Sequence, residues 1–185
     1  MGNTLALLIL LPALAWVVGS DLLYRRIHNL LVVALLLLWL LVPLSAPLGL
    51  GPWGNLSTGQ ALGLLARCSA GAVMVLVVGY SLFRLGRVGA GDVKLMAVLC
   101  LWAGDEQMAF LIVTALAGGV LAIALPLLTL VENTLAQSWL QFATRHLHLN
   151  IETPTVLTDH RPQGIPYGLA IATGALYTLF VPIHS

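Results

Sequence analysis

Charged residues are scarce in this chain. Only 8% of its 185 residues are Asp, Glu, Lys or Arg, whereas 59% are hydrophobic. A soluble domain typically carries about 25% charged residues, so this composition excludes an ordinary water-soluble globular protein. The net charge of +1 and the lack of a basic block give no indication of nucleic acid as a partner.

Cysteine is nearly absent as well. Cys68 and Cys100 lie far apart inside apolar stretches, and they form neither a CxxC pair nor a zinc-binding spacing. The HExxH motif of zinc peptidases does not occur either. We therefore expect no metal site, and we expect both cysteines to pack among membrane helices.

The N-terminus lacks the basic segment that begins a secretory signal. Residues 1–3 carry no positively charged side chain, and the apolar run continues past the small-x-small pattern at 13–15. A cleaved signal normally starts with a positively charged region. We therefore expect the first apolar run to stay in the protein as a membrane helix.

Long apolar runs fill most of the chain. About 20 apolar residues in helical form cross a bilayer, where the backbone must satisfy its own hydrogen bonds. The sequence therefore predicts an all-α, polytopic membrane helix bundle of about six transmembrane helices. No internal repeat is visible, and residues 1–185 are expected to form one domain. The expected spans are 3–20, 29–47, 59–83, 88–103, 108–131 and 164–183.

The eight Lys and Arg residues are distributed unevenly among the predicted loops. If the N-terminus is outside, seven of the eight lie in or beside the cytoplasmic connections, as the positive-inside rule favours. The exception is Arg67, which lies inside the third span. We expect its side chain to reach outward or to pair with Asp105 or Glu106.

The longest polar stretch is the predicted cytoplasmic loop 132–163. Within it, Leu135, Trp139 and Phe142 recur at nearly helical spacing, with polar residues between them. This pattern predicts an amphipathic helix that lies in the membrane interface and contacts lipid.

Two aspartates stand at predicted cytoplasmic helix ends. Asp21 follows the first span, and Asp92 follows a turn that contains Gly89 and Gly91. The helix over 93–103 would be about 16 Å long, too short to cross a hydrocarbon core of about 30 Å. We therefore expect Asp92 to be recessed below the membrane surface, where ionisable residues are costly and usually functional.

The residues alone leave the role of these aspartates open. Two carboxyl groups at one site can share acid–base work, because the ionised group activates water while the protonated group polarises a carbonyl. The aspartates could instead pair with Arg25, Arg26 or Lys94, or they could line a proton or ion pathway.

Three segments resemble the motifs of a known family. Residues 89–94 (GAGDVK) resemble the GxGDxK signature of the bacterial type IV prepilin peptidases, which are membrane aspartyl peptidases. Residues 21–29 (DLLYRRIHN) resemble the first motif of that family, with His28 where the family often has proline. Residues 164–170 (GIPYGLA) resemble its closing helix.

The resemblance implies an aspartic endopeptidase that removes the short basic leader from prepilins or pseudopilins. It places the reaction at the cytoplasmic face of the bacterial cytoplasmic (inner) membrane. It also implies Asp21 and Asp92 as the catalytic pair, with no metal and no cofactor besides water. The residues expected to bind substrate or shape the site are Gly89, Gly91, Lys94, Arg25, Arg26, Pro166 and Gly168.

The start of the chain and its lack of CxxC motifs indicate a subfamily. The chain begins directly with a span and lacks the paired CxxC motifs of the larger, methylating members. It therefore resembles the short, peptidase-only form associated with Flp, or tight-adherence, pili. A small transporter and a non-catalytic scaffold for pilus assembly are the alternatives.

Overall fold

The fold is entirely helical in the part of the chain that the structure describes. This computed structural model describes residues 2–146, 157 and 165–181. The absence of strands from these residues confirms the prediction of an all-α bundle. The elements are α1 (Gly2–Tyr24), α2 (Asn29–Ser45), η1 (Ala46–Leu48), α3 (Thr58–Arg84), α4 (Ala90–Ala103), η2 (Gly104–Glu106), α5 (Gln107–Ile123), α6 (Leu125–His146) and α8 (Tyr167–Phe180).

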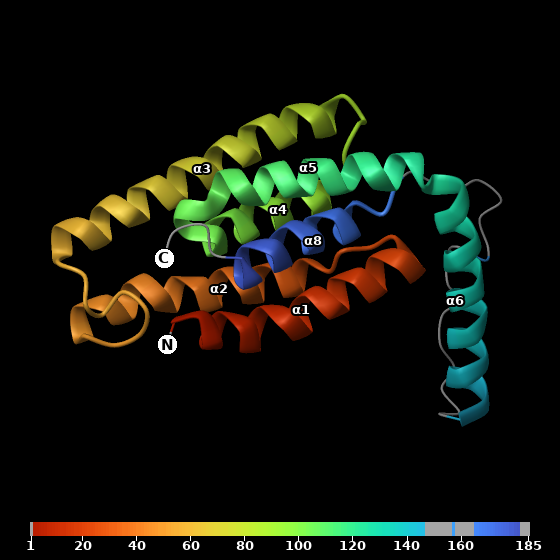
Figure 1. Cartoon of the computed structure of the whole chain (residues 1–185), viewed down its shortest axis with the longest axis horizontal. Helices are drawn as coiled ribbons and strands as arrows, with labels where there is room; N and C mark the ends of the chain where they lie inside the picture. The colour runs from red at the N-terminus through yellow and green to blue at the C-terminus, as the bar shows by residue number, and fades with distance from the viewer. Residues whose placement is uncertain (1, 147–156, 158–164, 182–185) are drawn as a thin grey trace.

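The helices form a bundle with α8 in its interior. As Figure 1 shows, α1 and α2 lie along one side, α3 lies along the other, and α4, α5 and α8 lie between them. Helix α8 packs against α1, α4 and α5, while α3 packs mainly against α4. The main core therefore contains residues of α1, α4, α5 and α8, including Leu14, Leu99, Phe110 and Ile171.

The bundle has the lengths and the surface of a membrane protein. Four described stretches are long and apolar enough to cross a bilayer: Ala6–Tyr24, Asn29–Leu48, Thr58–Arg84 and Ala90–Ile123. The last of these contains both α4 and α5, and α8 is a shorter apolar helix. Many large apolar side chains point outward, where lipid would cover them.

Two glycines allow neighbouring helices to approach closely. A Cβ atom on Gly79 of α3 would lie 2.5 Å from Cγ1 of Val93 on α4. A Cβ atom on Gly174 of α8 would lie 2.8 Å from the carbonyl oxygen of Phe110 on α5. The hydrophobic effect does not drive helix association in lipid. Small residues at such crossings allow the close van der Waals packing that does. These contacts fix α4 and α8, which carry parts of the candidate site.

The expected fifth span was wrong in its extent. We predicted a continuous helix over 108–131, but α5 ends at Ile123 and α6 begins at Leu125. Proline lacks an amide hydrogen and clashes with the preceding turn, so it favours a break in a helix but is accepted in a first turn. Pro126 lies in the first turn of α6. Helix α6 therefore leaves the bundle direction and crosses the end of the bundle (Figure 1).

Helix α6 contains the first part of the predicted loop 132–163. The side chains of Leu135, Trp139 and Phe142 are exposed, while Glu132 and Ala136 are buried against the bundle. These three residues give α6 an exposed apolar face. Contact of this face with the membrane interface remains a prediction, and most of the loop beyond residue 146 lies outside the described residues.

Arg67 makes one of the contacts expected from the sequence. Its Nη1 atom lies 3.6 Å from Oδ1 of Asp105, and both side chains are largely exposed. An exposed ion pair of this kind is typically worth about 0–1 kcal/mol. This confirms the pairing and places it at the end of the bundle opposite the aspartates.

Candidate active site

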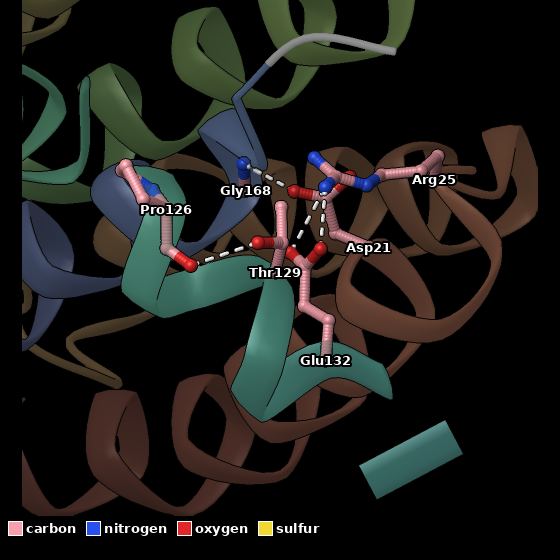
Figure 2. A network of polar contacts seen from close by, with 6 residues as sticks. All are labelled: Asp21, Arg25, Pro126, Thr129, Glu132 and Gly168. Carbon is pink, nitrogen blue, oxygen red and sulfur yellow. Dashed lines mark hydrogen bonds and ion pairs between the residues drawn. The ribbon is translucent and has the colours of Figure 1, made fainter. Parts of the chain in front are cut away.

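Asp21 lies inside the bundle rather than after the first helix. We expected it to follow the span, but α1 continues to Tyr24, so Asp21 belongs to the last turns of the helix. Its side chain is only 6% exposed. Figure 2 shows the contact that compensates for this burial: the backbone amide of Gly168 donates a hydrogen bond of 2.7 Å to Oδ2 of Asp21.

The start of α8 provides this donor. Pro166 is the N-cap residue of α8, so Gly168 is the second residue of the helix. The first amides of a helix have no partner within it, and the helix dipole favours an anion there. A Cβ atom on Gly168 would lie 2.8 Å from Oδ2 of Asp21. Glycine at this position therefore allows the contact between α8 and the carboxylate.

Asp92 lies at the start of α4 and is half-buried. Gly89 is the N-cap residue and Asp92 is the third residue of the helix, so the Asp92 carboxylate lies close to the Gly89 backbone. An acidic residue at this position is typical of a capping box. A Cβ atom on Gly89 would lie 2.7 Å from Oδ2 of Asp92, so a side chain would displace the carboxylate.

The structure brings the two aspartates to the same end of the bundle. Asp21 comes from α1 and Asp92 from α4, and their separation is small enough for the charge of Asp21 to act on Asp92. The sequence predicted this meeting of two segments that are 71 positions apart.

Gly91 contacts the loop between α1 and α2. A Cβ atom on Gly91 would lie 3.1 Å from Cβ of Ile27, which is tighter than ordinary contact. Ile27 belongs to the segment that follows Asp21, so this contact joins the two motifs. The predicted shaping role of Gly91 therefore has a physical basis in close packing of α4 against that loop.

The sequence analysis did not assign a role to Glu132. This residue of α6 is only 2% exposed, and both of its carboxylate oxygens accept hydrogen bonds from Nη2 of Arg25, at 2.8 and 2.9 Å (Figure 2). Burial raises the pKa of the Glu132 carboxyl, and the Arg25 guanidinium opposes that rise. One signal in the sequence could have pointed to it, since Glu132 is the first charge after a long apolar run.

The other predicted site residues lie at the edge of this arrangement. Lys94 is exposed, and its Nζ atom donates a hydrogen bond of 3.2 Å to Oδ1 of Asn29. Arg26 is also exposed and lines a cavity of about 600 Å³ beside α1, together with Trp16 and Trp139. Neither aspartate lines that cavity. A role for Lys94 or Arg26 in binding substrate remains a prediction.

Metal binding has no obvious place in this arrangement. Within the described ranges, no three His, Cys, Asp or Glu side chains are grouped closely enough to hold a metal ion.

Comparison with known families decides the class of the protein. A model of the type IV leader peptidase family matches residues 8–127, which is more than half of the chain. The chain belongs to this family. It is thus a leader peptidase, and its apolar helices make it a multi-pass membrane protein. No curated protein and no solved structure matches it.

The family match covers only part of the site of this leader peptidase. Asp21 and Asp92 both lie within residues 8–127, and so do the two glycines that precede Asp92. Glu132 and Gly168 lie beyond the matched residues. Their contacts with Arg25 and Asp21 therefore come from the structure alone.

Proposed function

We propose that this leader peptidase is an aspartic endopeptidase whose catalytic pair is Asp21 and Asp92. The observation that carries the proposal is the meeting of these two carboxyl groups at one end of the bundle, where Asp21 accepts a backbone hydrogen bond from Gly168 and Asp92 lies in the first turn of α4. Each carboxyl is removed at least partly from water. A peptide bond can be hydrolysed by such a pair without any further group.

The reaction divides one proton between the two carboxyl groups. The ionised aspartate takes a proton from a water molecule, whose oxygen attacks the scissile carbonyl carbon. The protonated aspartate donates its proton to the carbonyl oxygen, so a neutral tetrahedral intermediate forms. The carbon–nitrogen bond then breaks as the first aspartate passes its proton to the leaving amine. The intermediate returns the other proton, and the pair regains its starting state.

The proposed substrates are Flp-type prepilins or pseudopilins, as the sequence resemblance implies. They carry a short basic leader, then a glycine before the cut, then an apolar helix. That apolar helix can enter lipid beside the bundle, which places the cut near the membrane surface. Gly89 and Gly91 have no side chains, so the Asp92 end of α4 carries little side-chain bulk. This favours entry of an extended substrate backbone.

The proposed site faces the cytoplasm of a bacterial inner membrane, with the N-terminus of the chain outside. Seven of the eight Lys and Arg residues belong to the end that carries the aspartates or to the loop beyond it. The positive-inside rule favours the cytoplasm for such an end. The exposed apolar face of α6 supports the same placement, because it could lie in the interface while Glu132 contacts the bundle.

The test is cleavage of a purified prepilin by the purified enzyme in detergent, with Asp21→Asn and Asp92→Asn compared with the unchanged protein. We expect each variant to lose essentially all activity, and the double variant to be no worse than either single one. Asp105→Asn is the matched control, because it removes an exposed carboxylate from the opposite end. Substantial turnover by either site variant would refute the two-aspartate assignment.

A further inference from the structure

The buried ion pair between Arg25 and Glu132 has no role in the reaction described so far. A charged pair in a bundle interior is costly, and similar apolar residues often serve stability equally well. Glu132 is 2% exposed and Arg25 only 18% exposed at the side chain. The pair also connects two distant elements, the end of α1 and the helix α6 that crosses the bundle. Such a feature points to something other than stability.

The backbone at Arg25 has an unusual conformation. Arg25 has φ 51°, and it is the one residue other than glycine with positive φ in the described part of the chain. Helices commonly end in this left-handed conformation, but glycine usually occupies the position. For a residue with a side chain the conformation costs about 1–3 kcal/mol, and such strain gathers at functional sites. The bend follows directly after the turn that carries Asp21.

Arg25 acts on Asp21 as well as on Glu132. The guanidinium also lies within electrostatic range of the Asp21 carboxyl, beside which Figure 2 draws it. Glu132 in turn lies within electrostatic range of Asp21. The groups that face Asp21 are therefore Arg25 from its own end of α1, Asp92 from α4, Glu132 from α6 and the Gly168 amide from α8.

We propose that Glu132 is a positioning residue for the aspartate pair: it holds the Arg25 guanidinium in place and offsets its charge beside Asp21. A guanidinium is always protonated, so without Glu132 its full charge would act on Asp21. The pair would then give up its shared proton too readily. A pair that has lost this proton cannot protonate the scissile carbonyl. This inference rests on the proposed function.

A cycle of charge changes tests the proposal. Glu132→Gln keeps the shape of the side chain but removes its charge, and Arg25→Gln removes the opposing charge. We expect Glu132→Gln to lower kcat/KM about tenfold or more at neutral pH and to move the alkaline limb of the pH profile down by about one unit. The double variant restores the net charge, so its profile should return toward that of the unchanged enzyme. Glu132→Asp should recover part of the activity.

Matched controls separate this role from simple attachment of α6. Arg84→Gln removes an exposed cation from the same end of the bundle, and Asp105→Asn removes a carboxylate from the opposite end. Neither should move the pH profile. If Glu132→Gln lowers activity equally at every pH and the double variant restores nothing, Glu132 only anchors α6 and the proposal is wrong.

A second readout does not depend on cleavage. Infrared titration of the enzyme with isotope-labelled aspartate follows protonation directly, and the signal that disappears in Asp21→Asn belongs to Asp21. This signal should titrate at lower pH in Glu132→Gln and return in the double variant. If the unchanged enzyme is well folded but does not cleave prepilin, the proposed function is wrong. The titration of Asp21 then still decides whether Glu132 offsets the charge of Arg25. An unchanged Asp21 titration in Glu132→Gln would overturn the charge-balance proposal, even in an active enzyme.

Discussion

The backbone amide of Gly168 donates a 2.7 Å hydrogen bond to Oδ2 of Asp21, across 147 positions of the sequence. No side chain takes part on the donor side, so the contact depends on how closely α8 approaches α1. The space is tight: a Cβ atom on Gly168 would lie within 3.0 Å of Cβ and Cγ of Asp21. The hydrogen bond to the Asp21 carboxyl therefore depends on having glycine at position 168.

Gly168→Ala should impair catalysis without removing any functional group. The added methyl group must displace the Asp21 side chain and so lengthen its hydrogen bond to the amide. Because a hydrogen bond to a charged group is worth about 1.5–3 kcal/mol, we expect kcat/KM to fall about tenfold to a hundredfold. Cleavage of purified prepilin measures this effect.

Gly119→Ala in α5 is the control for this substitution. A Cβ atom there meets nothing within 4 Å, so activity and thermal stability should stay close to those of the unchanged protein. Equal activity of the two variants would show that the approach of α8 to Asp21 is unimportant.

Gly91→Val should be severe because it separates α4 from the α1–α2 loop. The first added atom already lies 3.1 Å from Cβ of Ile27, and the branched side chain needs still more room. Overpacking of this kind typically costs about 1–3 kcal/mol, and here it also moves Asp92. We expect little residual cleavage of prepilin, measured as kcat/KM.

Two further variants test the contact with Ile27. Gly63→Val places the same side chain in α3 where a Cβ atom meets nothing within 4 Å, and it should be nearly neutral. Combining Gly91→Ala with Ile27→Gly, which removes the contacting Cβ atom, should recover activity relative to Gly91→Ala alone. No recovery would mean that Gly91 acts through the substrate rather than through Ile27.

Accessibility to an impermeant thiol reagent should reveal the orientation of the bundle. A cysteine at Leu85, at the aspartate end, should be shielded in intact cells, whereas one at Asn55 should react. Both positions are exposed in the structure, and the natural Cys68 and Cys100 are fully buried, so background labelling should be low. The reverse pattern would place the aspartates outside the cell and contradict the proposed function.

Substrate choice should depend on shape more than on charge. In the described part of the chain, the exposed charges at the aspartate end are cations, whereas Asp21 and Glu132 are buried and Asp92 is half-buried. Among the described residues, a basic leader therefore meets no exposed acidic side chain at that end. Replacing one leader lysine should change kcat/KM less than about fivefold, since one exposed charge is worth about 0–1 kcal/mol.

Enlarging the substrate's glycine before the cut should have a much larger effect. A side chain there would meet the tightly packed end of α4, so we expect a loss of at least about a hundredfold, which corresponds to several kcal/mol of transition-state stabilisation. Comparing kcat/KM for the two altered prepilins decides the point. A greater loss from the lysine replacement would mean that electrostatic capture governs selection.

Hydropathy was sufficient to predict the helices, but not where one helix turns away. The apolar run over 108–131 looks continuous because hydropathy averages over many residues. The break after Ile123 lies beside Pro126, which stands in the first turn of α6 and has no amide hydrogen to donate to a continuing helix. Reading Pro126 as a first-turn residue would have placed the start of α6 correctly.

Some features of the candidate site could be predicted from short motifs, and others depend on how distant segments pack. The motifs pointed to Asp21 and Asp92, and the structure brings them together, although their catalytic role remains a prediction. Gly168 was named from the resemblance, but the use of its backbone amide was not foreseeable, because it depends on the packing of α8. The partnership of Arg25 and Glu132 was missed because 107 positions separate them.

The interior position of α8 has a consequence for how the protein is made. This helix supplies the Gly168 amide, yet it is synthesised 76 residues after Asp92. At about 5–20 residues per second, translation of that interval takes roughly 4–15 seconds. During that time the earlier helices can already sit in the membrane with an Asp21 carboxyl that lacks its donor. We therefore expect a growing chain to be a poor protease toward its neighbours until the last described helix inserts.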